Sequence, residues 1–215
     1  SGFQFTSGST PGIVVTVTAN RVALSQLNFS GYSAQKYITL QGQYDEVAYC
    51  NFENKPVGAP AGNLVHIDPG AGLPNYARIH HCSFRNMPGP GGDNGNECIR
   101  LSDGEQSAYV ARTVVEFNYF TNTGLGDSEE ISVKCRENVI RFNTCSNNQS
   151  AAVSFRNGDN NVAYGNFFIN AAGILIDRTI EGDDTDVSDV AALNTGFTGA
   201  GTEYTHNESE KIQVL

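Results

Sequence analysis

Apolar and polar residues alternate over short runs of this sequence, and two of the runs end in a cation. The run EEISVK (129–134) ends in Lys134, and the run AAVSFR (151–156) ends in Arg156. Alternation with a period of two predicts β-strands, so both cations lie on the face opposite the apolar residues. If the runs are neighbouring parallel strands in register, the cations are about 4.8 Å apart along the stacking direction. We therefore expect a functional site on this face.

A weak repeat along the chain supports this register. Each copy has an apolar residue, an aromatic residue or cysteine five positions later, and usually an asparagine two positions beyond that. The copies are Leu24/Phe29/Gly31, Val47/Phe52/Asn54, Ile79/Phe84/Asn86, Val115/Phe120/Asn122, Ile140/Cys145/Asn147 and Ala163/Phe168/Asn170. Two positions before each aromatic residue or cysteine stand Leu27, Cys50, Cys82, Asn118, Asn143 and Asn166. Such columns are typical of a solenoid, and asparagine suits its tight turns because it tolerates a left-handed backbone.

The repeats predict an all-β fold, a right-handed parallel β-helix with long loops on one side. Gly- and Pro-rich inserts such as 55–62 and 86–95 lengthen some copies. A helical solenoid would instead place apolar residues three and four positions apart. We expect one domain over 1–215, with an irregular start at 1–20, where 13–17 is a candidate first strand. Beyond Ile180 the repeat dissolves into an acidic sequence, which we interpret as a flexible tail or cap covering 180–215.

A second strand recurs after each insert and forms its own columns. Its inward pairs are Val65/Ile67, Ile99/Leu101, Ile131/Val133, Val153/Phe155 and Ile174/Ile176. The residue inside each pair is His66, Arg100, Ser132, Ser154 or Leu175, and the residue after it is Asp68, Ser102, Lys134, Arg156 or Asp177. In register, these columns bring His66, Arg100, Lys134 and Arg156 together on one outer face.

The net charge of the chain bears on which kind of partner it binds. The chain carries a net charge of −10, with 13 Lys and Arg against 23 Asp and Glu. This balance argues against a general nucleic-acid-binding protein, because affinity for phosphates depends mainly on Lys and Arg. Six of the cations nevertheless fall within 100–156, where a local strip could bind a polyanion; a salt-bridged surface is the alternative. No apolar run is long enough to cross a membrane, and no leader peptide is recognisable, so we expect no membrane partner.

The cysteines and histidines are weaker evidence for disulfides or a metal site. The five cysteines (50, 82, 98, 135 and 145) contain no C-x-x-C pair, which predicts buried free thiols rather than disulfides or a zinc site. His80 and His81 beside Cys82 suggest a metal site. Adjacent residues of a strand face opposite ways, however, which argues against that interpretation.

The cationic face predicts a particular chemistry. A neighbouring cation lowers the pKa of Lys134, which suits it to act as a general base, while Arg156 stays charged. Carboxylates and amides lie close in sequence, at Asp127, Glu129 and Glu130 and at Asn94, Asn96 and Glu97. Their oxygens are hard ligands suited to Ca²⁺. A base, an arginine and a metal together suggest β-elimination on a uronic-acid polymer; solvated coil-face residues without chemistry are the alternative.

Four motifs resemble those of the alginate lyase and chondroitinase B family of polysaccharide lyases (family 6). NGNECIRL (94–101) is similar to the family's N-G-G-E-x-I-R-I, and DSEEISVK (127–134) to its E-x-E-x-I-S-x-K. FRNG (155–158) is similar to L-R-H-G, and VAYGNFF (162–168) to V-x-G-N-F-F. The resemblance covers roughly 38–173. It implies Lys134 as the Brønsted base, Arg156 as the Brønsted acid, and Asn94, Asp127 and Glu129 as calcium ligands.

Three positions depart from the family pattern. Asp127 stands where the family has Glu, which shortens the reach to the metal; Asn157 replaces a His, and Cys135 replaces a Ser. Family members are also longer, with more coils. Some relatives work without calcium, so the resemblance implies the lysine more firmly than the metal.

These observations together predict a polysaccharide lyase that acts on alginate. Dermatan or chondroitin sulfate is the alternative substrate, and a non-catalytic carbohydrate-binding or structural β-helix is the competing class. We expect Arg100, His66 and Asn157 to contact substrate, with a salt bridge to Glu97 or Asp68 as the alternative for Arg100. A polymeric substrate implies a secreted or periplasmic protein.

Overall fold

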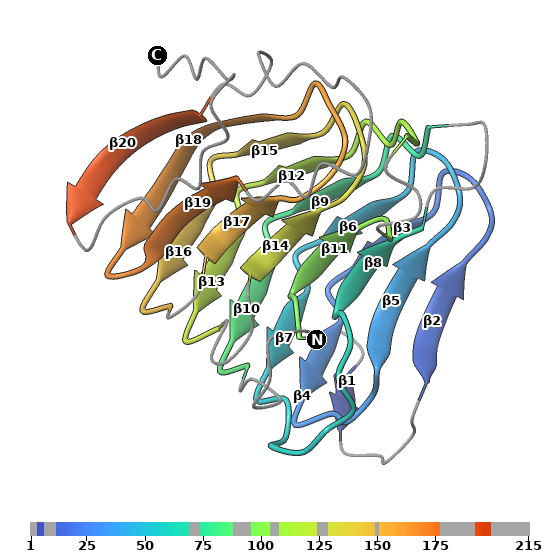
Figure 1. Cartoon of the computed structure of the whole chain (residues 1–215). Coiled ribbons are helices and arrows are strands. Elements are labelled where there is room, and N and C mark those ends of the chain that lie inside the picture. Colours follow the sequence, from blue (N-terminus) through green and yellow to red (C-terminus); the bar gives the residue numbers. More distant parts are fainter. Residues whose placement is uncertain are drawn as a thin grey trace.

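Parallel strands stacked in successive coils form the structure (Figure 1), as the repeats predicted. The computed structural model describes residues 4–6, 12–68, 74–87, 96–103, 108–123, 129–148, 151–176 and 192–198. Every strand pairing within these ranges is parallel, and they contain no helix. The chain is therefore a parallel β-helix, and the predicted fold class is confirmed.

Seven strands, one per coil, form the first sheet. They are β2 (Ile13–Val17), β5 (Lys36–Leu40), β8 (Val65–Ile67), β11 (Ile99–Leu101), β14 (Glu129–Val133), β17 (Ala151–Phe155) and β19 (Ala172–Ile176). The candidate first strand at 13–17 is therefore confirmed as β2. Every predicted inward pair of this sheet lies in register with the next.

The second sheet has thirteen strands in two rows joined by one long strand. One row holds β1 (Gln4–Thr6), β4 (Asn28–Ser30), β7 (Asn51–Glu53), β10 (Ser83–Arg85), β13 (Tyr119–Thr121) and β16 (Thr144–Ser146). The other holds β3 (Ala23–Ser25), β6 (Glu46–Ala48), β9 (Arg78–His80), β12 (Val114–Glu116) and β15 (Val139–Arg141). Strand β18 (Val162–Ile169) runs through both rows, and β20 (Ala192–Thr198) pairs with it. The sequence analysis did not predict β20; the remainder of 177–215 lies outside the described residues.

A column of phenylalanine rings fills the core. Phe29, Phe52, Phe84 and Phe120 are fully buried, and the ring centroids of successive coils are 5.1, 4.9 and 4.8 Å apart. The column follows from the repeat, because identical residues in register on adjacent parallel strands lie directly above one another. Cys145 and Phe168 continue it. All five cysteines are buried and free, as expected.

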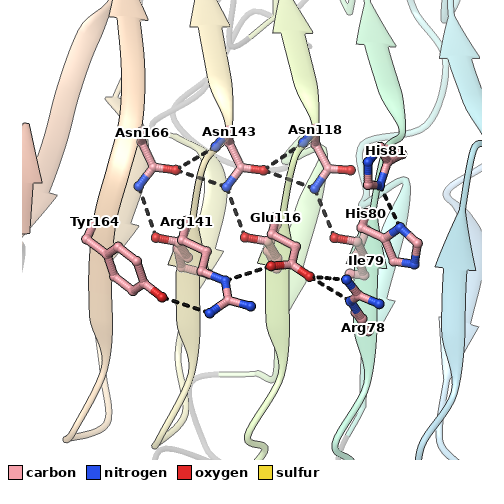
Figure 2. Close-up of polar contacts among 12 residues, drawn as sticks. Arg78, Ile79, His80, His81, Glu116, Asn118, Arg141, Asn143, Tyr164 and Asn166 are labelled. Atoms are coloured by element: carbon pink, nitrogen blue, oxygen red, sulfur yellow. Dashed lines mark hydrogen bonds and ion pairs between the residues drawn. The ribbon is translucent and has the colours of Figure 1, made fainter. Parts of the chain in front are cut away.

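A ladder of buried asparagines stabilises one corner (Figure 2). The Asn166 side-chain oxygen accepts hydrogen bonds from the backbone N–H and the side-chain amide of Asn143, both at 3.0 Å, and Asn143 does the same for Asn118. Each amide also donates to a backbone carbonyl of an earlier coil. These bonds satisfy buried polar groups that would otherwise cost free energy at every turn.

The turn asparagines also behave as predicted. Those that follow the row of β4 and β7 have left-handed backbone angles, with φ of 57, 53, 52, 56 and 49° at Asn54, Asn86, Asn122, Asn147 and Asn170. Asparagine adopts this conformation at lower cost than most residues because its short side chain bonds locally.

A network of ion pairs covers the outer face of β9, β12 and β15 (Figure 2). The buried Glu116 carboxylate accepts hydrogen bonds from Arg78 Nε at 2.7 Å and from Arg141 Nε at 2.6 Å. Arg141 also donates to the Tyr164 hydroxyl at 2.8 Å. Burial raises the pKa of Glu116, but the two arginines outweigh that effect and lower it below its usual range.

His80 and His81 depart from the expectation that neighbouring residues face opposite ways. Their Nδ1 atoms are 2.8 Å apart, because His81 has a φ of 53° and turns the chain at the end of β9. His80 Nε2 lies 2.6 Å from a Glu46 carboxylate oxygen. No group of three or more His, Cys, Asp or Glu able to hold a metal occurs among the described residues, here or elsewhere. In the same part of the chain, no helix has the length and apolar character needed to cross a membrane.

Candidate active site

The candidate site lies on the outer face of the seven-stranded sheet, where β11, β14 and β17 are neighbours. Ser132 pairs with Ser154, and Val133 with Phe155. Beyond the strands the ladder continues, because Lys134 N–H donates to the Leu101 carbonyl and Arg156 N–H to the Val133 carbonyl, each at 2.9 Å. Lys134 and Arg156 therefore occupy equivalent positions on successive coils, and the predicted register is confirmed.

Lys134 lies on the outer face of the sheet, as predicted, but it is buried there by neighbouring side chains. Only 7% of the residue is exposed. Burial lowers the pKa of Lys134, and the nearby Arg100 and Arg156 guanidiniums lower it further, whereas the Glu97 and Glu129 carboxylates act in the opposite direction. The predicted direction of the shift is confirmed, but burial is its largest cause, and Arg100 contributes more than Arg156.

Glu97 lies beside the lysine with no exposed surface. One of its oxygens accepts a 2.6 Å hydrogen bond from the Asn63 amide. The other is 3.7 Å from Arg100 Nη1 and 4.0 Å from Lys134 Nζ. Glu97 thus connects three coils, since Asn63 precedes β8 and Lys134 follows β14.

Glu129 makes the corresponding contact with Arg156. Its Oε1 accepts hydrogen bonds from Ser132 Oγ at 2.6 Å and from Arg156 Nη1 at 3.3 Å. Its Oε2 is buried and has no hydrogen-bond partner among the described residues. A buried carboxylate oxygen without a donor is available to a cation.

The three predicted calcium ligands can therefore be compared with the structure only in part. Glu129 fits the role, because its free oxygen is a hard ligand at the edge of the site. Asn94 and Asp127 lie outside the described residues.

Arg100 joins the site through acidic partners. Besides its contact with Glu97, its Nη2 is 2.7 Å from an Asp103 oxygen. The alternative that the sequence left open, a salt bridge to Glu97, is therefore present, with Asp103 rather than Asp68 as the second partner. About three quarters of the guanidinium side chain is covered, since 24% of it remains exposed.

His66 is almost fully buried next to Arg100 on the adjacent strand. Burial and the Lys36 ammonium lower the pKa of His66 to about 4, so the ring is neutral near pH 7. Lys36 Nζ lies 2.9 Å from Nδ1, and because an ammonium can only donate, Nδ1 accepts and Nε2 carries the proton. Nε2 has no hydrogen-bond partner in the described structure, and an Asp103 carboxylate oxygen lies 3.8 Å from it.

Asn157 follows Arg156 and is half-buried, with its backbone N–H 3.3 Å from the Val133 carbonyl. Sequence reasoning missed Lys36 and Asp103, which contact the predicted site residues His66 and Arg100, and Asn63, which contacts Glu97. The period-two pattern places Asn63 in the column of Glu97 and Glu129, which is a signal that could have identified it.

Comparison with known proteins gives a consistent family. The chondroitinase B family model matches residues 16–174. Two solved structures share the fold. One is a mannuronic-acid-specific polysaccharide family 6 lyase from human gut microbiota, with TM-score 0.66 and 21% identity over 90% of this chain and 62% of that chain. The other is the family 6 alginate lyase AlyGC, with TM-score 0.64 and 20% identity over 85% of this chain and 27% of that chain.

A curated protein matches a smaller part. Class I hydrophobin A of Arthroderma benhamiae is 36% identical over 75 residues, which are 34% of this chain and 50% of that protein. A match over so small a part of both chains does not assign this chain to the hydrophobins. This chain spans less than two thirds of the length of each of these relatives.

Proposed function

This chain belongs to the chondroitinase B family of polysaccharide lyases, and from that premise we propose that it cleaves uronic-acid polymers by β-elimination. The observation that carries the proposal is the equivalent placement of Lys134 and Arg156 on neighbouring coils. A base and a charge-stabilising group must reach the same sugar ring, and strands about 4.8 Å apart allow this.

In the proposed reaction Lys134 acts as the base. Its lowered pKa increases the fraction of neutral amine, which removes the proton at C5 of the uronate. The electron pair of the C5–H bond forms the C4–C5 double bond, and the C4–O bond breaks. Arg156 stabilises the negative charge on the departing oxygen and delivers its proton, so the products are an unsaturated sugar and a new hydroxyl end.

Three further residues are proposed to contact the substrate. The His66 Nε2–H group has no hydrogen-bond partner among the described residues; because it is buried, a sugar oxygen or carboxylate would reach it only if the side chains that cover it move aside. The exposed part of Arg100 is suited to a sugar carboxylate. Asn157, beside Arg156, is proposed to donate to the same sugar ring.

We propose Ca²⁺ as the cofactor, held by Glu129 together with Asn94 and Asp127. When bound, it would neutralise the sugar carboxylate and so acidify the proton at C5. Glu129 supports the proposal through its Oε2, which has no hydrogen-bond partner among the residues that the structure describes.

Alginate is the proposed substrate, and dermatan or chondroitin sulfate is the second candidate. Alginate is favoured because the net charge of −10 leaves few cations for the extra negative charge of a sulfated polymer. The chondroitinase B description of the family favours the second candidate. A polymeric substrate outside the cell implies that the protein is secreted or periplasmic.

The proposal is tested by incubating the protein with alginate, dermatan sulfate and pectate while following the ultraviolet absorbance of the unsaturated product. We expect absorbance to rise with alginate. A rise only with dermatan sulfate supports the second candidate. Retained binding without any rise in absorbance would instead identify a non-catalytic carbohydrate-binding or structural β-helix.

A further inference from the structure

The contact between a carboxylate and a cation is repeated on consecutive coils. Glu97 and Glu129 both stand two residues before the inward pair of their strand, in β11 and β14. In each case the cation that follows the next strand reaches back to the carboxylate: Arg156 to Glu129 at 3.3 Å, and Lys134 to Glu97 at 4.0 Å. Glu97 therefore contacts Lys134 from the preceding coil in the same way as Glu129 contacts Arg156.

Glu97 cannot itself touch a polymer on this face of the sheet, because none of its surface is exposed. It lies beneath the site, anchored by the 2.6 Å hydrogen bond from Asn63, and contacts the side chains of both Arg100 and Lys134. A buried carboxylate held rigidly from below can fix the positions of two flexible cations at once.

We propose that Glu97 is a positioning residue for the reaction, which holds the Lys134 amine and the Arg100 guanidinium in place. This inference rests on the proposed function. An amine on a four-carbon stem has many conformations, and losing its anchor displaces it from the proton that it must remove.

The charges around the lysine make the role measurable. Among the described residues, four charged groups act on Lys134: Arg100 and Glu97 from the preceding coil, Glu129 at the start of its own strand, and Arg156 from the following coil. Two are positive and two are negative. Removing the charge of Glu97 leaves two guanidiniums against one carboxylate, which favours the neutral amine.

The test compares Glu97→Gln with Glu116→Gln as a matched control. Glu116 is also a buried carboxylate between two cations, but it lies on the other sheet, among Arg78 and Arg141. The intact folded protein is labelled with dilute acetic anhydride across a range of pH. It is then digested, and the labelling of Lys134 is measured by mass spectrometry. We expect Glu97→Gln to lower the midpoint of Lys134 labelling by roughly one pH unit or more, and Glu116→Gln to leave it unchanged.

Turnover supplies the second measurement. We expect Glu97→Gln to reduce kcat by about tenfold or more, because the base is displaced, and to move the acidic limb of the pH profile to lower pH. Glu97→Asp keeps the charge on a shorter side chain and should restore part of both properties; it also serves if Glu97→Gln does not fold.

A labelling midpoint that stays at the wild-type value, or that moves equally in Glu116→Gln, overturns the inference. Labelling requires no turnover, so failure of this inference can be distinguished from failure of the proposed function. Failure of the proposed function appears as absence of unsaturated product from the wild type, whereas failure of this inference appears as an unmoved Lys134 midpoint.

Discussion

Lys134 and Arg156 hold equivalent places on consecutive coils, each donating its backbone N–H at 2.9 Å to the strand of the coil before it. Their side chains then meet different carboxylates, Glu97 and Glu129, at 4.0 and 3.3 Å. The same repeat thus places an amine beside a guanidinium that lies closer to its carboxylate. In the proposed reaction the amine is the base and the guanidinium is the charge-stabilising group.

The asparagine ladder should be a main source of stability at its corner. Asn143→Ala removes the side-chain hydrogen bonds to Asn118 and Asn166 and to the Val115 carbonyl, leaving buried backbone groups without partners. We expect the free energy of unfolding to fall by about 2–4 kcal/mol, measured by urea denaturation. Asn51→Ala removes a half-buried amide contact with Asn28 and is the control, with an expected loss below about 1 kcal/mol. Equal losses in the two variants would contradict a special role for the ladder.

Ionisation of Glu130 should lower the free energy of unfolding as pH rises. Glu130 is fully buried, and burial raises its pKa to about 8, although Thr123 and Cys145 act in the opposite direction. Between its unfolded pKa near 4.5 and its folded pKa near 8, the folded state holds one proton that the unfolded state has lost, so stability falls with increasing pH.

Glu130→Gln removes this titration. Plots of the unfolding free energy against pH should become less steep between pH 5 and 8, by about 1.4 kcal/mol per pH unit. Glu116→Gln is the comparison of opposite sign: its lowered pKa stabilises the fold above the unfolded pKa, and that stability is lost as pH falls. A variant slope identical to that of the wild type in the range from pH 5 to 8 would show that Glu130 ionises normally.

Calcium should stabilise the folded protein if Glu129 is a ligand. We expect the Tm to rise on adding Ca²⁺ and to return after chelation, because a ligand that binds only the folded state shifts the unfolding equilibrium. Glu129→Gln should abolish the rise, and titration calorimetry measures the binding directly. If neither chelation nor Ca²⁺ changes Tm, heat of binding or activity, the assignment of Asn94, Asp127 and Glu129 is wrong.

The register could be predicted from the sequence, whereas the surroundings of the site could not. Alternation fixes the face on which a residue lies, and the repeat fixes its neighbour on the next coil, so the columns of Phe52 and Lys134 followed from position alone. Burial of Lys134 depends on the paths of the side chains around it, which no periodicity encodes. The contact of Lys36 with His66 and of Asp103 with Arg100 depends likewise on the paths of side chains.

The histidine pair shows the limit of the strand rule. Alternation applies only while the backbone stays extended, and His81 lies where a left-handed residue ends the strand. The sequence does mark this corner in later coils. Phe117 and Phe142, which occupy the position of His81, are each followed directly by an asparagine of the ladder.

The central claim is that Lys134 removes the proton, and the rate of unsaturated-product formation by Lys134→Ala tests it most directly. Because the lysine is buried, the variant is first matched to the wild type by circular dichroism and Tm, and Lys134→Met keeps most of the side-chain volume as a second variant. The account predicts that the wild type raises the ultraviolet absorbance of an alginate or dermatan sulfate solution and that both folded variants lose roughly a thousandfold or more in kcat. A folded variant that retains a rate within about tenfold of the wild type would contradict it.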